Sequence, residues 1–323
     1  MRILSWHVHG SWTTSFVQGR HDYLLPVTPD RGPDGRGRAE TWDWPATAVE
    51  VPPERLRDAD VDVVLLQRPH ELGLVEEWLG RRPGVDVPAV YVEHNTPRGP
   101  SVETRHPLAD RTDIPLVHVT HFNAMAWDNG RAPTSVIEHG IVDPGYRYTG
   151  EQESLGVVVN EPVRRWRVAG TDLLLQVADR VPVEVYGMGM AELVGTTPKF
   201  DGRSDCAVHD DVPQVRMHGM LGRHRAYFHP YRWTSLGLSL LEAMTIGLPV
   251  LALATTEAPR AVPPGAGVLS CDPDELVAAA RRWLADPDEA RETGLAAREH
   301  ALARYGLKRF LDDWDHILEG VTP

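Results

Sequence analysis

The chain has 323 residues, 42% of them hydrophobic, which suits two domains of about 150 residues each. Acidic residues outnumber basic ones by 46 to 33, and the formal net charge of −13 argues against nucleic-acid binding and for a membrane contact that is at most peripheral. No run of eighteen apolar residues or signal-peptide core is present, so we expect a soluble, cytoplasmic protein. The two isolated cysteines, Cys206 and Cys271, indicate neither a disulfide framework nor a metal cluster.

The first predicted strand, residues 2–8, leads into a turn with Gly10 and Ser11. In an open α/β sheet the loop after the first strand lies at the ligand crevice, so their amides are candidates for holding a diphosphate. Residues 28–54, rich in Pro, Gly and charge, read as an exposed loop.

Further buried strands are predicted over residues 60–67 and 89–95. His94 lies at the carboxyl end of the latter, where the crevice of an α/β sheet collects its polar groups. We therefore treat His94 as a candidate catalytic residue, with a structural role as the alternative.

A second sheet is predicted to open at residues 155–160, after a domain boundary near 144–153. Arg164, Arg165 and Arg167 then form a cationic cluster in a predicted loop ahead of a helix that starts at residues 170–175. Arginine favours fork-shaped recognition of phosphate or carboxylate, whereas a solvated cluster is the alternative.

Residues 231–250 predict one helix between two loops. Thr234 and Ser235 offer N-cap oxygens, residues 236–246 are mostly apolar, and Gly247 can take the left-handed stop position. The apolar run 250–254 that follows is typical of a parallel strand buried on both faces.

Glu242 is the one charge in this apolar helix, and a buried carboxylate needs hydrogen-bond donors. An arginine, a loop amide or two ligand hydroxyls would serve. The amides of Ser235, Leu236, Gly237 and Leu238 lie near the helix N-terminus, which favours an anion such as phosphate. Phosphate at the helix start and hydroxyls one to two turns further on outline a nucleoside diphosphate.

The order Pro230, Gly237-Leu238, Glu242-Ala243-Met244, Gly247 and Pro249-Val250 resembles the donor-site signature of retaining glycosyltransferases of family 4. The resemblance implies an α/β, GT-B fold, in which two Rossmann-like domains face a central cleft and a C-terminal helix crosses back. The expected ranges are an acceptor-side domain over residues 1–148, a donor domain over 149–305 and the crossover helix over 306–323.

The resemblance also assigns roles to residues. It implies that Glu242 binds the ribose, that Arg164 and its neighbours hold the diphosphate, and that His94 contacts the donor sugar or its leaving phosphate. The remaining substrate-binding candidates are Gly10, Ser11, Arg165, Arg167, Gly187, His218, Gly219, Thr234, Ser235, Leu236, Gly237 and Leu238. Two positions depart from the family pattern, because Thr234 stands where a sugar-binding Glu is usual and Ala169 where a Lys is usual.

The implied function is a retaining, metal-independent transferase, with no cofactor, that moves a sugar (a hexose is expected) from a nucleotide sugar, UDP- or GDP-linked, to a hydroxyl of a glycan, glycolipid or small metabolite. A nucleotide-sugar-binding protein without turnover is the main alternative. A phosphorylase that uses pyridoxal phosphate is less favoured, because neither Lys199 nor Lys308 lies beside a crevice motif.

The C-terminal end of the chain predicts three helices, over residues 272–285, 286–305 and 308–318. Phe310, Trp314 and Ile317 share one face of the last, which we expect to be the crossover helix.

Overall fold

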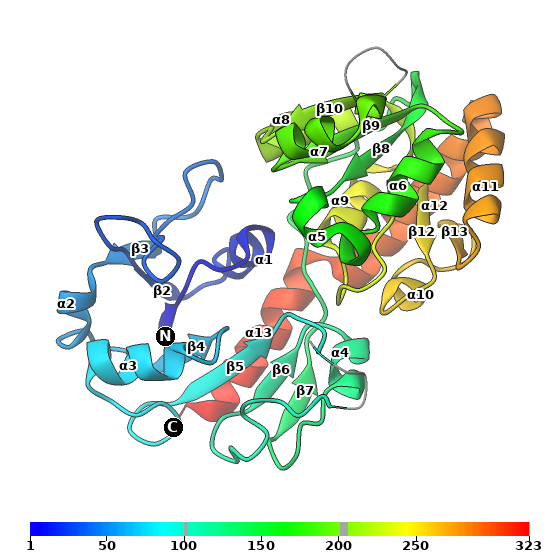
Figure 1. Ribbon diagram of the computed structural model, residues 1–323. Coiled ribbons are helices and arrows are strands. Elements are labelled where there is room, and N and C mark those ends of the chain that lie inside the picture. Colours follow the sequence, from blue (N-terminus) through cyan, green and yellow to red (C-terminus); the bar gives the residue numbers. More distant parts are fainter. Residues whose placement is uncertain (98, 100–102, 201–205, 323) are drawn as a thin grey trace. The chain divides into compact units, whose positions relative to one another are not determined.

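The computed structural model describes residues 1–97, 99, 103–200 and 206–322, which form two compact units (Figure 1). Unit 1 comprises Met1–Val142 and Leu307–Pro323, and unit 2 comprises Asp143–Gly306. Each unit is built on a parallel sheet, as predicted for an α/β chain. The last helix belongs to the same unit as the first strand, which is the predicted crossover.

The described part of unit 1 contains a seven-stranded sheet in the order β3-β2-β1-β4-β5-β6-β7. All neighbouring strands are parallel. The strands are β1 (Arg2–Ser5), β2 (Asp22–Pro26), β3 (Ala48–Val51), β4 (Val63–Leu66), β5 (Ala89–Glu93), β6 (Leu116–His118) and β7 (Thr134–Val136). The helices are α1 (Gly10–Phe16), α2 (Pro53–Leu56), α3 (Glu71–Leu79), α4 (His121–Ala126) and α13 (Leu307–Val321).

Unit 2 carries a six-stranded parallel sheet in the order β10-β9-β8-β11-β12-β13 within its described residues. The strands are β8 (Gln152–Val158), β9 (Val183–Gly187), β10 (Cys206–Asp210), β11 (His224–His229), β12 (Val250–Leu253) and β13 (Gly267–Ser270). The helices are α5 (Pro162–Ala169), α6 (Thr171–Ala178), α7 (Met190–Thr196), the 3-10 helix η1 (Pro198–Phe200), α8 (Gln214–Leu221), α9 (Leu238–Ile246), α10 (Ala258–Ala261), α11 (Pro273–Ala285) and α12 (Pro287–Tyr305).

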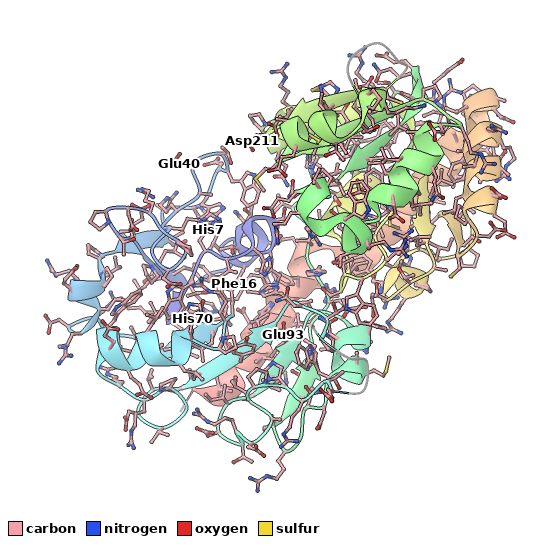
Figure 2. The ribbon with its side chains drawn as sticks, in the orientation of Figure 1. His7, Phe16, Glu40, His70, Glu93 and Asp211 are labelled. Atoms are coloured by element: carbon pink, nitrogen blue, oxygen red, sulfur yellow. The ribbon has the colours of Figure 1, made fainter. Side chains whose placement is uncertain are left out.

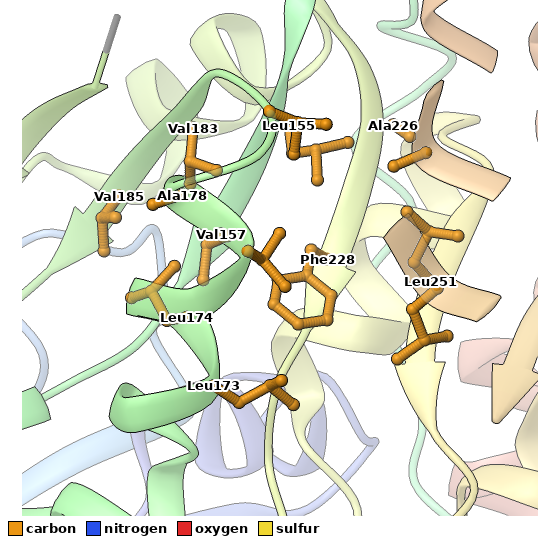
Figure 3. Packing of buried hydrophobic residues seen from close by; sticks show 14 of the residues in the cluster. Leu155, Val157, Leu173, Leu174, Ala178, Val183, Val185, Ala226, Phe228 and Leu251 are labelled. Atoms are coloured by element: carbon orange, nitrogen blue, oxygen red, sulfur yellow. The ribbon is translucent and has the colours of Figure 1, made fainter. Parts of the chain in front are cut away.

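The core of unit 2 lies between one face of its sheet and the helices that cover that face. Figure 3 shows Val157 and Phe228 of the strands beside Leu173 and Leu174 of α6, and all four are buried. Parallel strands covered on both faces require apolar side chains on successive residues, which is why the run 250–254 predicts β12 correctly. No helix among the described residues is long and apolar enough to cross a membrane.

Helices α11 and α12 confirm the predicted ranges, and in both the N-cap residue is an aspartate. The Asp272 side chain accepts from the amide of Asp274 at 2.9 Å, and the Asp286 side chain accepts from that of Glu289 at 3.0 Å. These bonds satisfy amides that a helix start leaves unpaired, and the negative charge also suits the helix dipole.

Three local predictions were wrong. Within residues 28–54, predicted as an exposed loop, residues 48–51 form strand β3. Helix α9 begins at Leu238 with Gly237 as its N-cap and no side-chain cap, so Thr234 and Ser235 precede the helix without capping it. The backbone before it is held elsewhere, because the amide of Arg232 donates to the carbonyl of Val168 at 3.1 Å. The arginine cluster lies in helix α5, not in a loop, since Pro162 has a φ angle suited to the first turn of a helix.

Helix α13 is held to unit 1 by aromatic packing and by hydrogen bonds. Trp314 packs edge-on against Trp12 and Phe16, with ring centroids 5.6 and 5.4 Å apart. Arg309 donates from Nη2 to the carbonyl of His139 at 2.7 Å. Unit 1 is therefore completed only by the last residues of the chain.

We expect Trp314→Ala to lower the free energy of unfolding of unit 1 by about 3–5 kcal/mol, the usual loss for truncating a buried aromatic side chain. Urea unfolding followed by circular dichroism measures it. Trp233→Ala removes the same side chain from an exposed position and should cost under about 1 kcal/mol. Equal losses in the two variants would contradict the packing role of α13.

Candidate functional site

Non-glycine residues with positive φ collect at one edge of unit 2. Glu161 (φ 53°), Asp211 (φ 47°, labelled in Figure 2) and Thr256 (φ 49°) each lie in the loop after a strand, namely β8, β10 and β12. This conformation is unfavourable for side chains with a Cβ and is concentrated at functional sites. The three residues lie outside the carboxyl ends of the strands, which is where open α/β sheets bind ligands.

Gly187 ends strand β9 at this edge with φ 141°. A Cβ at this position would overlap the carbonyl of Val159 and the side chain of Asn160. The glycine predicted as a substrate-binding turn is thus required by the backbone of the neighbouring loop. The amide of Met188, which follows it, donates to Oδ1 of Asn160 at 3.0 Å.

Helix α9 starts at the same edge, and it needs a glycine at its N-cap for a steric reason. The His229 ring fills the space in which a Cβ of Gly237 would lie. The first amides of α9 have no side-chain cap, and Gly237 and Leu238 are half-exposed.

The Glu242 carboxylate is buried, and helix α8 supplies its hydrogen-bond donors. Gln214 Nε2 donates to Oε1 at 2.9 Å, and His218 Nε2 lies 3.3 Å from Oε2. The sequence predicts that Glu242 needs a donor, and it names His218 as a site residue, but it does not connect the two. A carboxylate has about four lone-pair positions and can accept several hydrogen bonds at once.

The three predicted arginines differ in their partners. Arg164 pairs with Glu161, and Arg167 Nη1 lies 2.7 Å from Oδ2 of Asp172. Arg165 forms no ion pair with a described residue. Its guanidinium carbon lies 5.2 Å from the ring centroid of Tyr231.

An aromatic and polar group connects Tyr231 to helix α9. The Tyr231 ring stacks on His229 at 4.6 Å, and the Tyr227 hydroxyl lies 3.2 Å from His229 Nδ1 and 2.9 Å from Ser239 Oγ. Burial, and to a smaller extent Arg165, lowers the pKa of His229 to about 3, so the imidazole is neutral.

At the carboxyl edge of unit 1, the tautomer of His94 is fixed. Gln67 Nε2 donates to the carbonyl of Trp6 at 2.6 Å, so Gln67 Oε1 accepts from His94 Nε2 at 3.0 Å. The His94 Nδ1 is then the acceptor nitrogen. His94 itself is largely buried, and its ring lies 4.3 Å from that of His9.

Glu93, labelled in Figure 2, and His106 form a buried pair that the sequence does not indicate. The amide of Leu108 donates to His106 Nδ1 at 3.1 Å, so the proton is on Nε2, which donates to Glu93 Oε2 at 3.1 Å. The amide of Asn95 donates to the other carboxylate oxygen at 2.6 Å. Each oxygen of this buried charge therefore has a donor.

His139 follows strand β7 and is also buried. Neither ring nitrogen has a hydrogen-bond partner among the described residues. Burial, with His9 nearby, lowers the pKa of His139 to about 3, and burial lowers that of His9 to about 4. The pKa of His94 is held well below its ordinary value of 6.5 by burial and by its two histidine neighbours.

The other candidates are distributed as follows. Gly10 and Ser11 form the first turn of α1, where the Trp42 ring covers the Cβ side of Gly10. Gly219 lies inside helix α8, where its backbone is helical and no turn is present. Unit 2 thus brings together Glu242 and His218 in one group and Arg165 with the start of α9 in another.

Sequence reasoning missed Gln214, Tyr227, His229 and Tyr231. One signal was available, because Tyr227, His229 and Tyr231 alternate along β11 and its continuation and so share one face of an extended chain. Nothing in the spacing of Gln214 and Glu242 indicates that α8 and α9 are neighbours.

Comparison with known proteins agrees with this geometry. Residues 164–315 match the model of a family described as glycosyl transferase-like. No curated protein sequence matches the chain. The matched region includes helices α8 and α9, which carry Glu242 and its hydrogen-bond donors.

Solved structures show the fold. A sucrose-phosphate synthase from Thermosynechococcus elongatus is 13% identical over 99% of this chain and 98% of its own, with a TM-score of 0.73. HepE from Anabaena, solved in complex with UDP, is 15% identical over 99% and 100%, with a TM-score of 0.72. A glycosyltransferase from Rickettsia africae is 12% identical over 99% and 98%, with a TM-score of 0.70. The chain has the GT-B fold that the sequence predicts.

The buried histidines make unit 1 sensitive to acid. Since His9, His94 and His139 have lowered pKa values in the folded state, the unfolded chain binds more protons below pH 6.5, and stability falls as the pH drops. We expect the stability of unit 1 to be fully present above about pH 7 and to fall from about pH 6.5 down to about pH 4 for His9 and about pH 3 for His139, each histidine adding up to about 1.4 kcal/mol per pH unit.

Urea unfolding at several pH values measures this slope. His139→Phe should reduce the slope by about the share of one histidine, whereas His316→Gln, at an exposed position of α13, should leave it unchanged. A slope that is the same with and without His139 would contradict the assignment.

Proposed function

We propose that the chain is a retaining, metal-independent glycosyltransferase of the family 4 type. It takes a sugar from a UDP- or GDP-linked donor and transfers it to a hydroxyl acceptor. The observation that carries the proposal is the buried Glu242 carboxylate beside an uncapped helix start, inside the region that matches a glycosyl transferase-like family. Unit 2 is the proposed donor domain and unit 1 the acceptor side.

Glu242 is the proposed ribose contact. Gln214 and His218 contact its two oxygens, which fixes the orientation of the carboxylate. Two vicinal hydroxyls of a ribose can then donate to the remaining lone pairs. Several structural neighbours support this choice of ligand, because HepE was solved with UDP and with UDP-glucose.

Arg165 is the proposed cation for the diphosphate. Its neighbours Arg164 and Arg167 are exposed and already paired with Glu161 and Asp172, whereas Arg165 is half-buried against Tyr231. The amides at the start of α9 supply further donors to a phosphate. Together they stabilise the negative charge that develops on the leaving diphosphate.

The proposed chemistry needs no dedicated base. The acceptor hydroxyl attacks on the face from which the phosphate leaves, its oxygen bonds to the anomeric carbon, the bond to the phosphate oxygen breaks, and the departing phosphate takes the hydroxyl proton. His94 remains the candidate contact to the donor sugar, with Nδ1 as its acceptor atom.

A binding protein without turnover is the second candidate. Ala169, where the family pattern has a Lys, is fully buried, so no cation is presented from that position. Release of free nucleotide diphosphate from the donor sugar, with or without acceptor, separates the two functions, because a binding protein releases none.

We expect Glu242→Gln to weaken binding of the preferred nucleotide diphosphate by about 10- to 100-fold, which is the cost of about 1.5–3 kcal/mol for a hydrogen bond to a charged group. Isothermal calorimetry with UDP and GDP, with EDTA and with magnesium, measures it. Glu192→Gln, an exposed site on α7, is the matched control. If no nucleotide binds the unaltered protein, the donor-site assignment is wrong.

Among the three arginines, we expect Arg165→Met to weaken UDP binding the most, by about tenfold, and uridine binding hardly at all, because only the diphosphate uses the cation. Arg164→Met and Arg167→Met should each change UDP affinity less than about threefold, since both side chains are exposed ion-pair members. The same calorimetric titrations measure the affinities of the three variants for UDP and uridine. A larger loss for Arg164→Met would reassign the diphosphate cation.

A further inference from the structure

Two aromatic rings, those of Tyr231 and His229, lie between the Arg165 guanidinium and the start of helix α9. The Arg165 guanidinium lies over Tyr231, Tyr231 stacks on His229 with an angle of 28° between the rings, and the His229 ring packs against Gly237. A cation within about 6 Å of an aromatic centroid is attracted to the ring. A continuous series of ring contacts therefore connects the Arg165 guanidinium to the backbone at the start of α9.

The middle of the stack cannot shift easily. Tyr231 and His229 are 8% and 3% exposed, so both rings are enclosed by neighbouring atoms. Thr255 Oγ1 donates to the carbonyl of Tyr231 at 3.1 Å, which fixes its backbone from the loop after β12. His229 is held from below by the Tyr227 hydroxyl, which also lies within hydrogen-bond distance of Ser239 in α9.

Gly237 belongs to the same packing arrangement. Any side chain there would meet the His229 ring, so the ring can pack directly against the N-cap backbone of α9. His229 thus contacts Gly237, the N-cap residue of α9. On its other side it stacks on Tyr231, over which the Arg165 guanidinium lies.

We propose that Tyr231 and His229 are positioning residues for phosphate recognition: they hold the Arg165 guanidinium at a fixed distance from the first amides of α9. A diphosphate then meets a cation and backbone donors whose geometry is set before it binds. The inference rests on the proposed nucleotide-sugar function and names the residues that make its phosphate subsite rigid. A pre-organised side chain loses less conformational entropy on binding than a free one, and affinity rises accordingly.

The chemistry of the stack predicts which ligands lose affinity when the stack is disrupted. UDP carries the charge that Arg165 and the amides bind, whereas uridine lacks it. Loss of the Tyr231 ring therefore should weaken UDP and leave uridine unchanged. It should also have no further effect once Arg165 is gone, because Tyr231 acts through that arginine.

A double-mutant cycle tests this on the full chain, with UDP and uridine as probes in calorimetry. Tyr231→Leu is expected to weaken UDP about five- to tenfold and uridine less than twofold, while Tyr231→Phe, which keeps the ring, loses less than about threefold. Arg165→Met/Tyr231→Leu should bind UDP no more weakly than Arg165→Met alone. Tyr148→Phe, which removes a buried hydroxyl elsewhere in unit 2, is the control and should leave both affinities unchanged.

The outcomes separate the inference from the function on which it rests. Additive losses in the cycle, or equal losses for UDP and uridine, overturn the positioning role while UDP binding by the unaltered protein still supports the donor site. Binding of neither probe by the unaltered protein overturns both. If Tyr231→Leu fails to fold, His229→Leu replaces it in the same cycle, with His229→Gln as the conservative variant that should recover most of the affinity.

Discussion

The burial of one carboxylate constrains the packing of helices in unit 2. Glu242 lies in a helix that is otherwise apolar, and a charge at such a position is tolerated only with donors close by. Gln214 and His218 provide them, so α8 must pack beside α9 with one particular face inward. Two helices that belong to different crossovers of the sheet are thus joined by hydrogen bonds to one carboxylate. A hydrophobic residue at position 242 would pack equally well but would fix neither the neighbour nor its orientation.

Charge is distributed unequally among chemically identical side chains. Arg164, Arg165 and Arg167 occupy one short helix, yet Glu161 and Asp172 neutralise the outer two. Exposed ion pairs of this kind add little stability, so their effect is to restrict which guanidinium remains for an anion. The Arg165 guanidinium lies over the ring of Tyr231. Its neighbour is therefore an aromatic side chain and not a carboxylate, and this is why Arg165 is the cation chosen in the proposal.

In unit 1 the polar groups that gather at the sheet edge are histidines. Its sheet edge brings together the half-buried His9 and the buried His94 and His139, and desolvation lowers the pKa of all three. Gln67 sets the tautomer of His94, and Arg309 of α13 holds the backbone that carries His139. The C-terminal helix therefore contributes to the shape of an edge formed mainly by the first 142 residues. Neutral imidazoles can accept or donate hydrogen bonds at neutral pH without the desolvation cost of a buried ion.

The sequence by itself determined the fold class, the crossover helix, the helices at the C-terminal end, and the need of Glu242 for partners, because these follow from hydrophobic runs, caps and one misplaced charge read locally. Only the tertiary structure decided which side chains form hydrogen bonds with Glu242. Gln214 and Glu242 are 28 residues apart, and their pairing depends on how α8 and α9 pack. The start of α9 also escaped local reading: Thr234 and Ser235 are good capping residues, but Arg232 is bonded to the backbone of Val168, and the helix begins only after Gly237. Capping preference is worth about 1 kcal/mol, which long-range packing readily outweighs.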